Sequence, residues 1–182
     1  FGVSVAYEVP GWPGTEEFAA HQTAALETDA DGLAGTLTCL MWMQPIANAG
    51  KMGQIKIAGI ETVSADIADL MAGGIYVGSF SEITDVFGLA IPMIINAVDG
   101  NDPQQRNADG TAGQVGVKNW VITDAEDMAY FAELESGEGD WVFSIDDVKT
   151  AIVAFNPEVS VDSLSELYSA VSADEIRARR GN

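Results

Sequence analysis

Apolar and polar residues alternate at the start of the chain. Every second residue between Phe1 and Val9 is apolar, and a strand would place these side chains on one face. A period of two is typical of a strand with one buried side, so the pattern predicts a strand over residues 1–9. The sequence Pro-Gly-Trp-Pro-Gly at 10–14 then ends the strand.

Further strands are predicted by similar alternation or by short apolar runs bounded by turn residues. They span residues 35–44, 54–63, 75–80, 114–123 and 140–145. Gly59, inside the second of these ranges, predicts a β-bulge. All but the last lie in the first two thirds of the chain.

Helices are predicted where a serine, threonine or aspartate that can cap a helix precedes an apolar stripe with a period near 3.6. Their ranges are 16–28, 65–72, 124–136, 145–155 and 162–180, the last with a break near Val171. Two of these predicted starts carry a capping box, Thr123 with Glu126 and Ser172 with Glu175.

This order of elements predicts an α+β fold. We expect a mixed or antiparallel sheet from the β-rich first two thirds, with helices packed on it that come mainly from the C-terminal third. A chain of 182 residues is ordinary for one domain, so residues 1–182 are predicted to form a single domain. Residues 99–113 are rich in Gly, Asn, Asp and Pro, which predicts an exposed loop.

Charge narrows the choice of partners. The chain has 28 acidic against 8 basic residues and a formal net charge of −20, which disfavours nucleic acid as its main partner. The longest apolar run covers residues 86–98 and is interrupted by Gly88 and Pro92. It is shorter than the roughly 20 residues that a membrane-spanning helix needs, so no membrane span is expected.

Cysteine and histidine are too few for several chemistries. Cys39 and His21 are the only residues of their types, which leaves no intrachain disulfide and no zinc site of the Cys/His kind. Cys39 lies in an apolar run and is predicted to be a small buried hydrophobe. No serine elbow or phosphate-binding glycine loop is present, so no catalytic or cofactor-binding residue is assigned.

Calcium is the one candidate cofactor. Aspartate and asparagine oxygens are hard ligands that suit this ion, and two loops contain several of them. The candidate ligands are Asp29 and Asp31 in one loop and Asp99, Asn101, Asp102 and Asp109 in the other. The first loop lacks the twelfth-position glutamate of an EF-hand, and a turn at the end of a helix is the favoured explanation of its aspartates. Turn formation alone also explains the second loop.

The basic tail contrasts with the acidic body. Arg177, Arg179 and Arg180 lie close together, whereas all 28 acidic residues precede them. The tail can complement the dipole of its own helix or dock on the acidic body of another copy. Adding the alternating first segment and Trp12, we predict an interface between copies at Phe1, Val3, Val5, Tyr7, Trp12, Arg177, Arg179 and Arg180.

These observations favour a non-enzymatic, self-associating structural subunit of the virion, tail-tube or extracellular-filament type, whose partners are copies of itself. A secreted or periplasmic binding module that uses the aspartate-rich loops with calcium is the first alternative. A hydrolase that works with carboxylates alone is the second. The leading interpretation places the protein outside the cell or in a virion.

Overall fold

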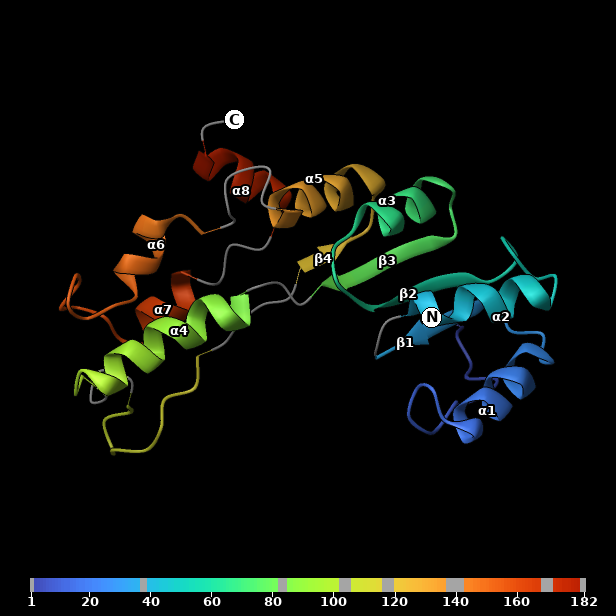
Figure 1. The fold of residues 1–182 in the computed structure, drawn as a ribbon, viewed down its shortest axis with the longest axis horizontal. Coiled ribbons are helices and arrows are strands. Elements are labelled where there is room, and N and C mark those ends of the chain that lie inside the picture. Colours follow the sequence, from blue (N-terminus) through green and yellow to red (C-terminus); the bar gives the residue numbers. More distant parts are fainter. Residues whose placement is uncertain are drawn as a thin grey trace.

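A computed structural model of the chain describes all residues except 1, 37–38, 82–84, 102–105, 116–119, 137–142, 168–171 and 181–182. The described residues contain one four-stranded sheet in the order β1-β2-β3-β4. The strands are β1 (Gly32–Gly35), β2 (Lys56–Glu61), β3 (Tyr76–Ser81) and β4 (Trp120–Ile122). The first three are parallel and β4 is antiparallel to β3 (Figure 1).

Helices precede, connect and follow these strands. In chain order they are α1 (Glu16–Leu26), the 3-10 helix η1 (Cys39–Trp42), α2 (Met43–Asn48), α3 (Ala65–Ala72), α4 (Asp85–Val98), α5 (Ala125–Ser136), α6 (Ile145–Thr150), α7 (Val161–Leu167) and α8 (Ala173–Arg180). The prediction of an α+β fold with a mixed sheet is confirmed, and the strands lie in the first two thirds of the chain.

Local capping signals predicted the helix starts well. Thr15, Ser64 and Ser144 each accept a hydrogen bond from a backbone N–H in the first turn of α1, α3 and α6. Ser172 and Glu175 form the predicted capping box of α8. Helix α5 differs, since the side chain of Asp124 caps it by accepting from Asp127 N at 2.8 Å. Side chains that satisfy the free N–H groups of a first turn explain these boundaries.

Two predicted strands are wrong. Residues 2–10 have no regular secondary structure, and Phe1 lies outside the described residues. Of the described residues within 35–44, Gly35 alone belongs to a strand, and residues 39–44 are helical. A strand needs a partner to accept its backbone hydrogen bonds, and period-two alternation by itself does not supply one.

Other boundaries agree in part. The predicted strand 54–63 is β2 and the strand 75–80 is β3, but the register shift falls between Ile57 and Ala58 rather than at Gly59. Only residues 120–122 of the predicted strand 114–123 are described as a strand. Much of 140–145 lies outside the described residues, and Ile145 begins a helix. In the predicted loop, described residues 106–112 are exposed.

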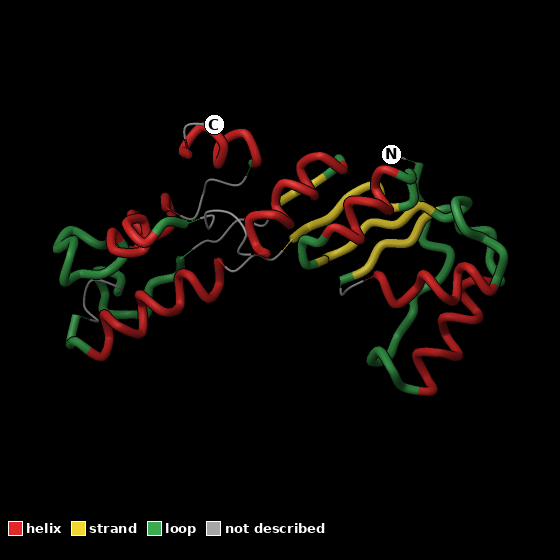
Figure 2. Tube along the Cα trace, turned by 45° about the horizontal axis from the view of Figure 1, so that its top comes forward, coloured by secondary structure: helices red, strands yellow, loops and turns green. Residues whose placement is uncertain are grey.

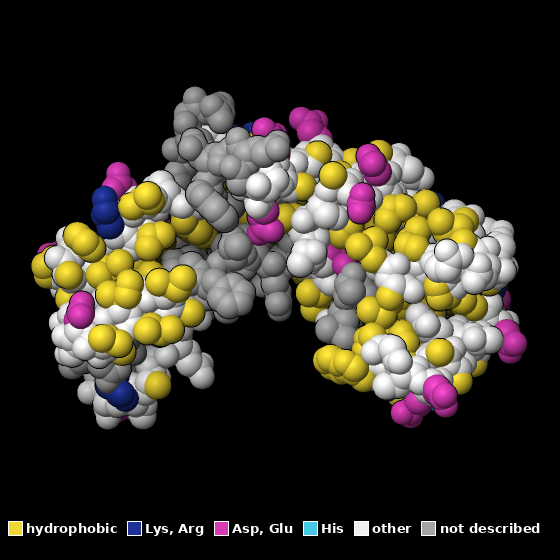
Figure 3. Space-filling model, in the orientation of Figure 1, with side chains coloured by type: hydrophobic (Ala, Val, Ile, Leu, Met, Phe, Trp, Pro, Cys, Tyr) yellow, Lys and Arg dark blue, Asp and Glu magenta, His cyan; other side chains and the backbone are white. Residues whose placement is uncertain are grey.

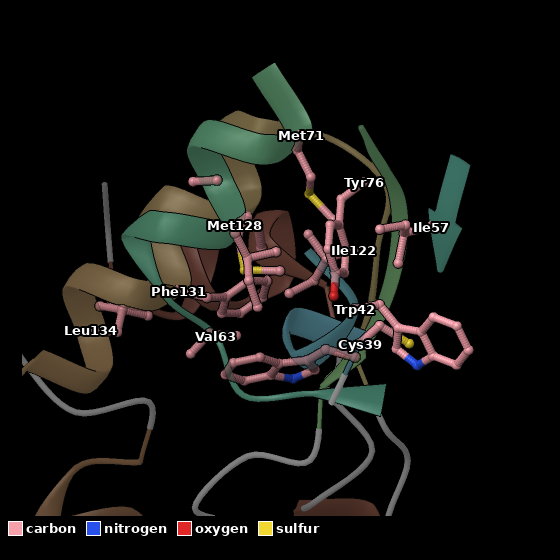
Figure 4. Packing of buried hydrophobic residues seen from close by; sticks show 14 of the residues in the cluster. Cys39, Trp42, Ile57, Val63, Met71, Tyr76, Ile122, Met128, Phe131 and Leu134 are labelled. Carbon is pink, nitrogen blue, oxygen red and sulfur yellow. The ribbon is translucent and has the colours of Figure 1, made fainter. Parts of the chain in front are cut away.

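The main hydrophobic core lies between one face of the sheet and the helices beside it. Figure 4 shows Met71 from α3 and Met128 and Phe131 from α5 directed toward Tyr76 and Ile122 of the sheet. Phe131 also stacks on the buried indole of Trp120, with ring centroids 3.6 Å apart. We call β1–β4 with α1, η1, α2, α3, α5 and α8 the sheet unit.

Helices α4, α6 and α7 lie apart from the sheet, as both Figure 1 and Figure 2 show. Their own buried cluster contains Ala151, Val159 and Leu164 among the described side chains. The buried amide of Asn96 in α4 donates to Ala151 O at 2.9 Å and accepts from Val153 N at 2.8 Å. We call this group, residues 85–98 and 143–167, the helical unit.

Candidate functional site

Functional side chains gather where the parallel strands end. The chain leaves β1 toward η1 and leaves β2 toward α3, so Cys39 and Glu61 come to the carboxyl edge of the sheet. The loops that leave parallel strands start at this edge and bring backbone and side-chain polar groups together there. This edge is therefore the candidate site.

Glu61 is the central residue of the site. It is the last residue of β2, and its side chain points into the covered side of the sheet, where the residue is only 3% exposed. One carboxylate oxygen, Oε1, accepts hydrogen bonds from Cys39 N and, at 2.7 Å, from the hydroxyl of Tyr76. The other oxygen, Oε2, is buried and has no hydrogen-bond partner among the described residues.

An unpartnered carboxylate oxygen in a protein interior is costly, since water solvates such an oxygen strongly in the unfolded chain. Such groups are few in folded proteins and each one calls for an explanation. A bound molecule that donates a hydrogen bond to Oε2 would supply the missing partner.

Trp120 presents a complementary group. Its indole Nε1 is a buried hydrogen-bond donor, also without a partner among the residues that the structure describes. Ser81 is the register partner of both Glu61 in β2 and Trp120 in β4. Glu61, with the unpartnered acceptor, and Trp120, with the unpartnered donor, therefore lie in one row across the sheet, with β3 between their strands.

Gly59 allows Cys39 to approach the sheet. A Cβ atom at position 59 would lie 2.8 Å from Cys39 Sγ, closer than real Cβ contacts, and 3.4 Å from Glu61 Oε1. A side chain at position 59 would therefore displace Cys39, whose backbone N–H holds the carboxylate. The glycine serves close packing here, which is a second common reason for glycine in a strand.

The pKa values of Cys39 and Tyr76, the two titratable groups that contact Glu61, are both raised. Burial, and then the negative charge of Glu61, raise the pKa of the Cys39 thiol to about 12. Burial and the hydrogen bond to Glu61 raise the pKa of Tyr76 well above its usual range. Because both groups stay protonated near neutral pH, Tyr76 acts as a hydrogen-bond donor and Cys39 is no thiolate nucleophile.

Sequence reasoning missed Glu61, although a signal was present. In the predicted strand 54–63, the phase that holds Ile55, Ile57 and Val63 also holds Glu61. An acid on the apolar phase of a half-buried strand predicts a buried carboxylate. Trp120 had no comparable signal, because tryptophan is an ordinary core residue.

Two surface hollows lie outside this set of polar groups. The larger, of about 590 Å³, begins at Val63 and Ser64 and runs between α3 and α5, where alanines leave space beneath Asp69 and Glu133. The smaller, of about 240 Å³, lies between α7 and the turn after α6. Neither is lined by Glu61 or Trp120, so we assign no site to them.

The described aspartates among the calcium candidates belong to no cluster of three acidic, histidine or cysteine side chains. Among the described residues, no three His, Cys, Asp or Glu side chains lie close enough to hold a metal ion. The carboxylate of Asp109 accepts from the Thr111 hydroxyl at 2.6 Å and from Thr111 N at 3.0 Å, and these bonds lower the pKa of Asp109. Asp109 thus stabilises a turn, and Asp102 lies outside the described residues. A calcium requirement stays a prediction.

The predicted interface residues have varied environments. Val3, Val5 and Trp12 are exposed, while the hydroxyl of Tyr7 lies 2.7 Å from His21 Nδ1. Phe1 and the side chains of Arg179 and Arg180 are outside the described residues. An interface through these residues is therefore still a prediction.

Arg177 has contacts within its own chain. Its guanidinium lies 3.1 Å from a carboxylate oxygen of Asp127 and 3.2 Å from one of Asp174, and 4.3 Å above the ring of Tyr130. The contacts with Asp127 and Tyr130, together with the buried side chain of Ile176, fasten α8 to α5. This arginine is thus already engaged without a second copy.

Comparisons with known proteins identify no relative of the chain. No helix in the described part of the chain is long and apolar enough to cross a membrane. No family model, curated protein or solved structure matches the chain.

Proposed function

We propose that the chain is a binding module that holds a small hydroxylated molecule at the carboxyl edge of its sheet. The single observation that carries this proposal is the buried, unpartnered oxygen Oε2 of Glu61. A molecule with several hydroxyl groups suits the site, because one hydroxyl can donate to this oxygen and another can accept from the unpartnered Nε1 of Trp120.

Binding is favoured over catalysis by the chemistry of the surrounding groups. Cys39 is protonated, and the hydroxyl of Tyr76 donates a hydrogen bond to Glu61. The hydrogen-bond donors to Glu61 are the backbone N–H of Cys39 and the protonated hydroxyl of Tyr76, and neither is an activated nucleophile. The site therefore supports recognition through hydrogen bonds. The extracellular location stays a prediction.

The variant Glu61→Gln tests the proposal at the level of one atom. Glutamine keeps Oε1 as the acceptor for Cys39 N and Tyr76, but it places an NH₂ donor where Oε2 was. A hydroxyl that donates to Oε2 would lose its acceptor, which costs about 1.5–3 kcal/mol for a hydrogen bond to a charged group. Affinity should fall by at least about tenfold.

The measurement is a thermal-shift and calorimetric titration with glucose, ribose, glycerol and myo-inositol as probes. At least one probe should raise the melting temperature of the wild-type chain and change tryptophan fluorescence. Glu16→Gln, an exposed acid in α1, is the matched control and should leave binding unchanged. Absence of binding by all four probes, or equal affinity in Glu61→Gln, would contradict the proposal.

A further inference from the structure

Helix α4 is apolar on both of its sides. The side that faces the helical unit holds Met93, which packs against the buried cluster, and the buried Asn96. The opposite side exposes Ile91, Ile94 and Val98, with Ile94 60% and Val98 80% exposed. A helix at a protein surface normally carries polar residues outward, and a helix that is apolar all round is normally buried all round.

The sheet has an uncovered apolar face. Phe80 is the register partner of Ile60 in β2 and of Val121 in β4, so these three side chains form a row across the sheet. Phe80 is 49% and Val121 60% exposed, whereas Glu61, Trp120 and Ile122 on the other face are buried. Right-handed crossovers between strands in sequential order put the connecting helices on one face, which explains why the other stays open.

These two surfaces do not meet within one chain. Helix α4 packs on α6 in the helical unit, and the sheet lies in the other unit (Figure 1). Figure 3 shows hydrophobic side chains gathered along α4 on the face toward the viewer, with few charged side chains among them. A helix stripe and a sheet face are the two halves of an ordinary helix-on-sheet layer.

We propose that a second copy of the chain covers both surfaces. The outer side of α4 in each copy packs on the Ile60, Phe80 and Val121 row of the other copy, in a closed dimer with two-fold symmetry. Because symmetry repeats the contact, both apolar surfaces of both copies become buried. This inference is independent of the proposed ligand site, which lies on the opposite face of the sheet.

Charge favours these two surfaces over the rest of the chain as the place where two copies can meet. The chain has a net charge of −20, so two copies repel each other across most of their surfaces. Asp85 is the one charged residue in the sequence of α4, and β3 and β4 contain no charged residue. Contact through these elements brings few like charges together, and burial of their apolar side chains favours association.

Light scattering coupled to size-exclusion chromatography of the full chain at moderate salt tests the proposal. The wild-type chain should elute with the mass of a dimer. Ile94→Glu and Phe80→Glu each put a charge into the apolar contact and should weaken the dimer by at least about tenfold. Met52→Glu, at an exposed apolar residue in the loop before β2 and outside the contact, is the matched control and should leave the dimer intact.

Mixing the two variants tests the reciprocal arrangement. A mixed dimer of the two variants has one contact with both substitutions and one contact with neither, so the mixture should form more dimer than either variant alone. Circular dichroism of each variant checks that the exposed substitution leaves the fold unchanged. A strictly monomeric wild-type chain, a dimer insensitive to both substitutions, or no gain on mixing would overturn the proposal.

Discussion

The sheet unit and the helical unit are stabilised in different ways. In the sheet unit, large side chains such as Trp120, Tyr76 and Phe131 are fully or almost fully buried against the strands. In the helical unit, the buried cluster is small, and one amide, Asn96, connects α4 to the turn after α6. Apolar residues of α4 point outward instead. Apolar burial therefore holds the first unit, whereas the second depends on hydrogen bonds and on what covers it.

The largest effect is expected from removing the deepest aromatic ring of the sheet unit. Trp120→Ala deletes a fully buried indole that stacks on Phe131, and it should lower the free energy of unfolding by about 3–5 kcal/mol. Urea denaturation followed by circular dichroism measures this. Met52, exposed in the loop before β2, is the control, and Met52→Ala should change the free energy by about 0.5 kcal/mol or less. A loss below about 1 kcal/mol in Trp120→Ala would show that the sheet core is not what stabilises this unit.

A smaller and more local effect is expected in the helical unit. Asn96→Ala leaves the carbonyl of Ala151 and the N–H of Val153 without their partner, at a cost of about 1–3 kcal/mol. Hydrogen exchange should show faster exchange at Val153 but unchanged protection in β2 and β4. Asn107→Ala, in the exposed loop, is the control. Equal loss of protection in both units would mean that they open together and behave as the predicted single domain.

The third effect concerns pH and only the sheet unit. The pKa of Cys39 is raised from an ordinary value of 9.0 to about 12 in the folded chain, and that of Tyr76 is raised as well. The unfolded chain then releases protons above about pH 9 while the folded chain keeps them, so stability is complete below this pH and falls above it. By about pH 10.5, the contribution of Cys39 amounts to a loss of about 1–2 kcal/mol.

Urea midpoints at pH 8 and 10.5 measure this loss. The variant Cys39→Ala lacks the titrating thiol, so its midpoint should fall less over the same interval. A wild-type midpoint that stays constant, or a variant that falls as steeply as the wild type, would show that the thiol is not buried beside Glu61 as described.

Local signals were sufficient for the capped helices of this fold and insufficient for η1, α2 and α4 and for parts of the sheet. Thr15, Ser64 and Ser144 act on N–H groups only a few residues away, so their sequence neighbours determine the outcome. The alternation at 1–9 needed a partner strand, which the sequence does not specify. The carboxylate of Glu61 depends on Cys39, 22 residues earlier, and on Tyr76, 15 residues later. Such a site arises only when the strands are already side by side.

The single thiol of the chain has a practical consequence. Cys39 is enclosed by β2 at Gly59 and is almost fully buried, so a thiol reagent can reach it only after the sheet unit has opened. The rate at which a reagent modifies Cys39 therefore measures how often the sheet unit opens, and no probe has to be attached to the protein. Comparing this rate with and without a bound molecule would show how much the molecule slows the opening of the sheet unit.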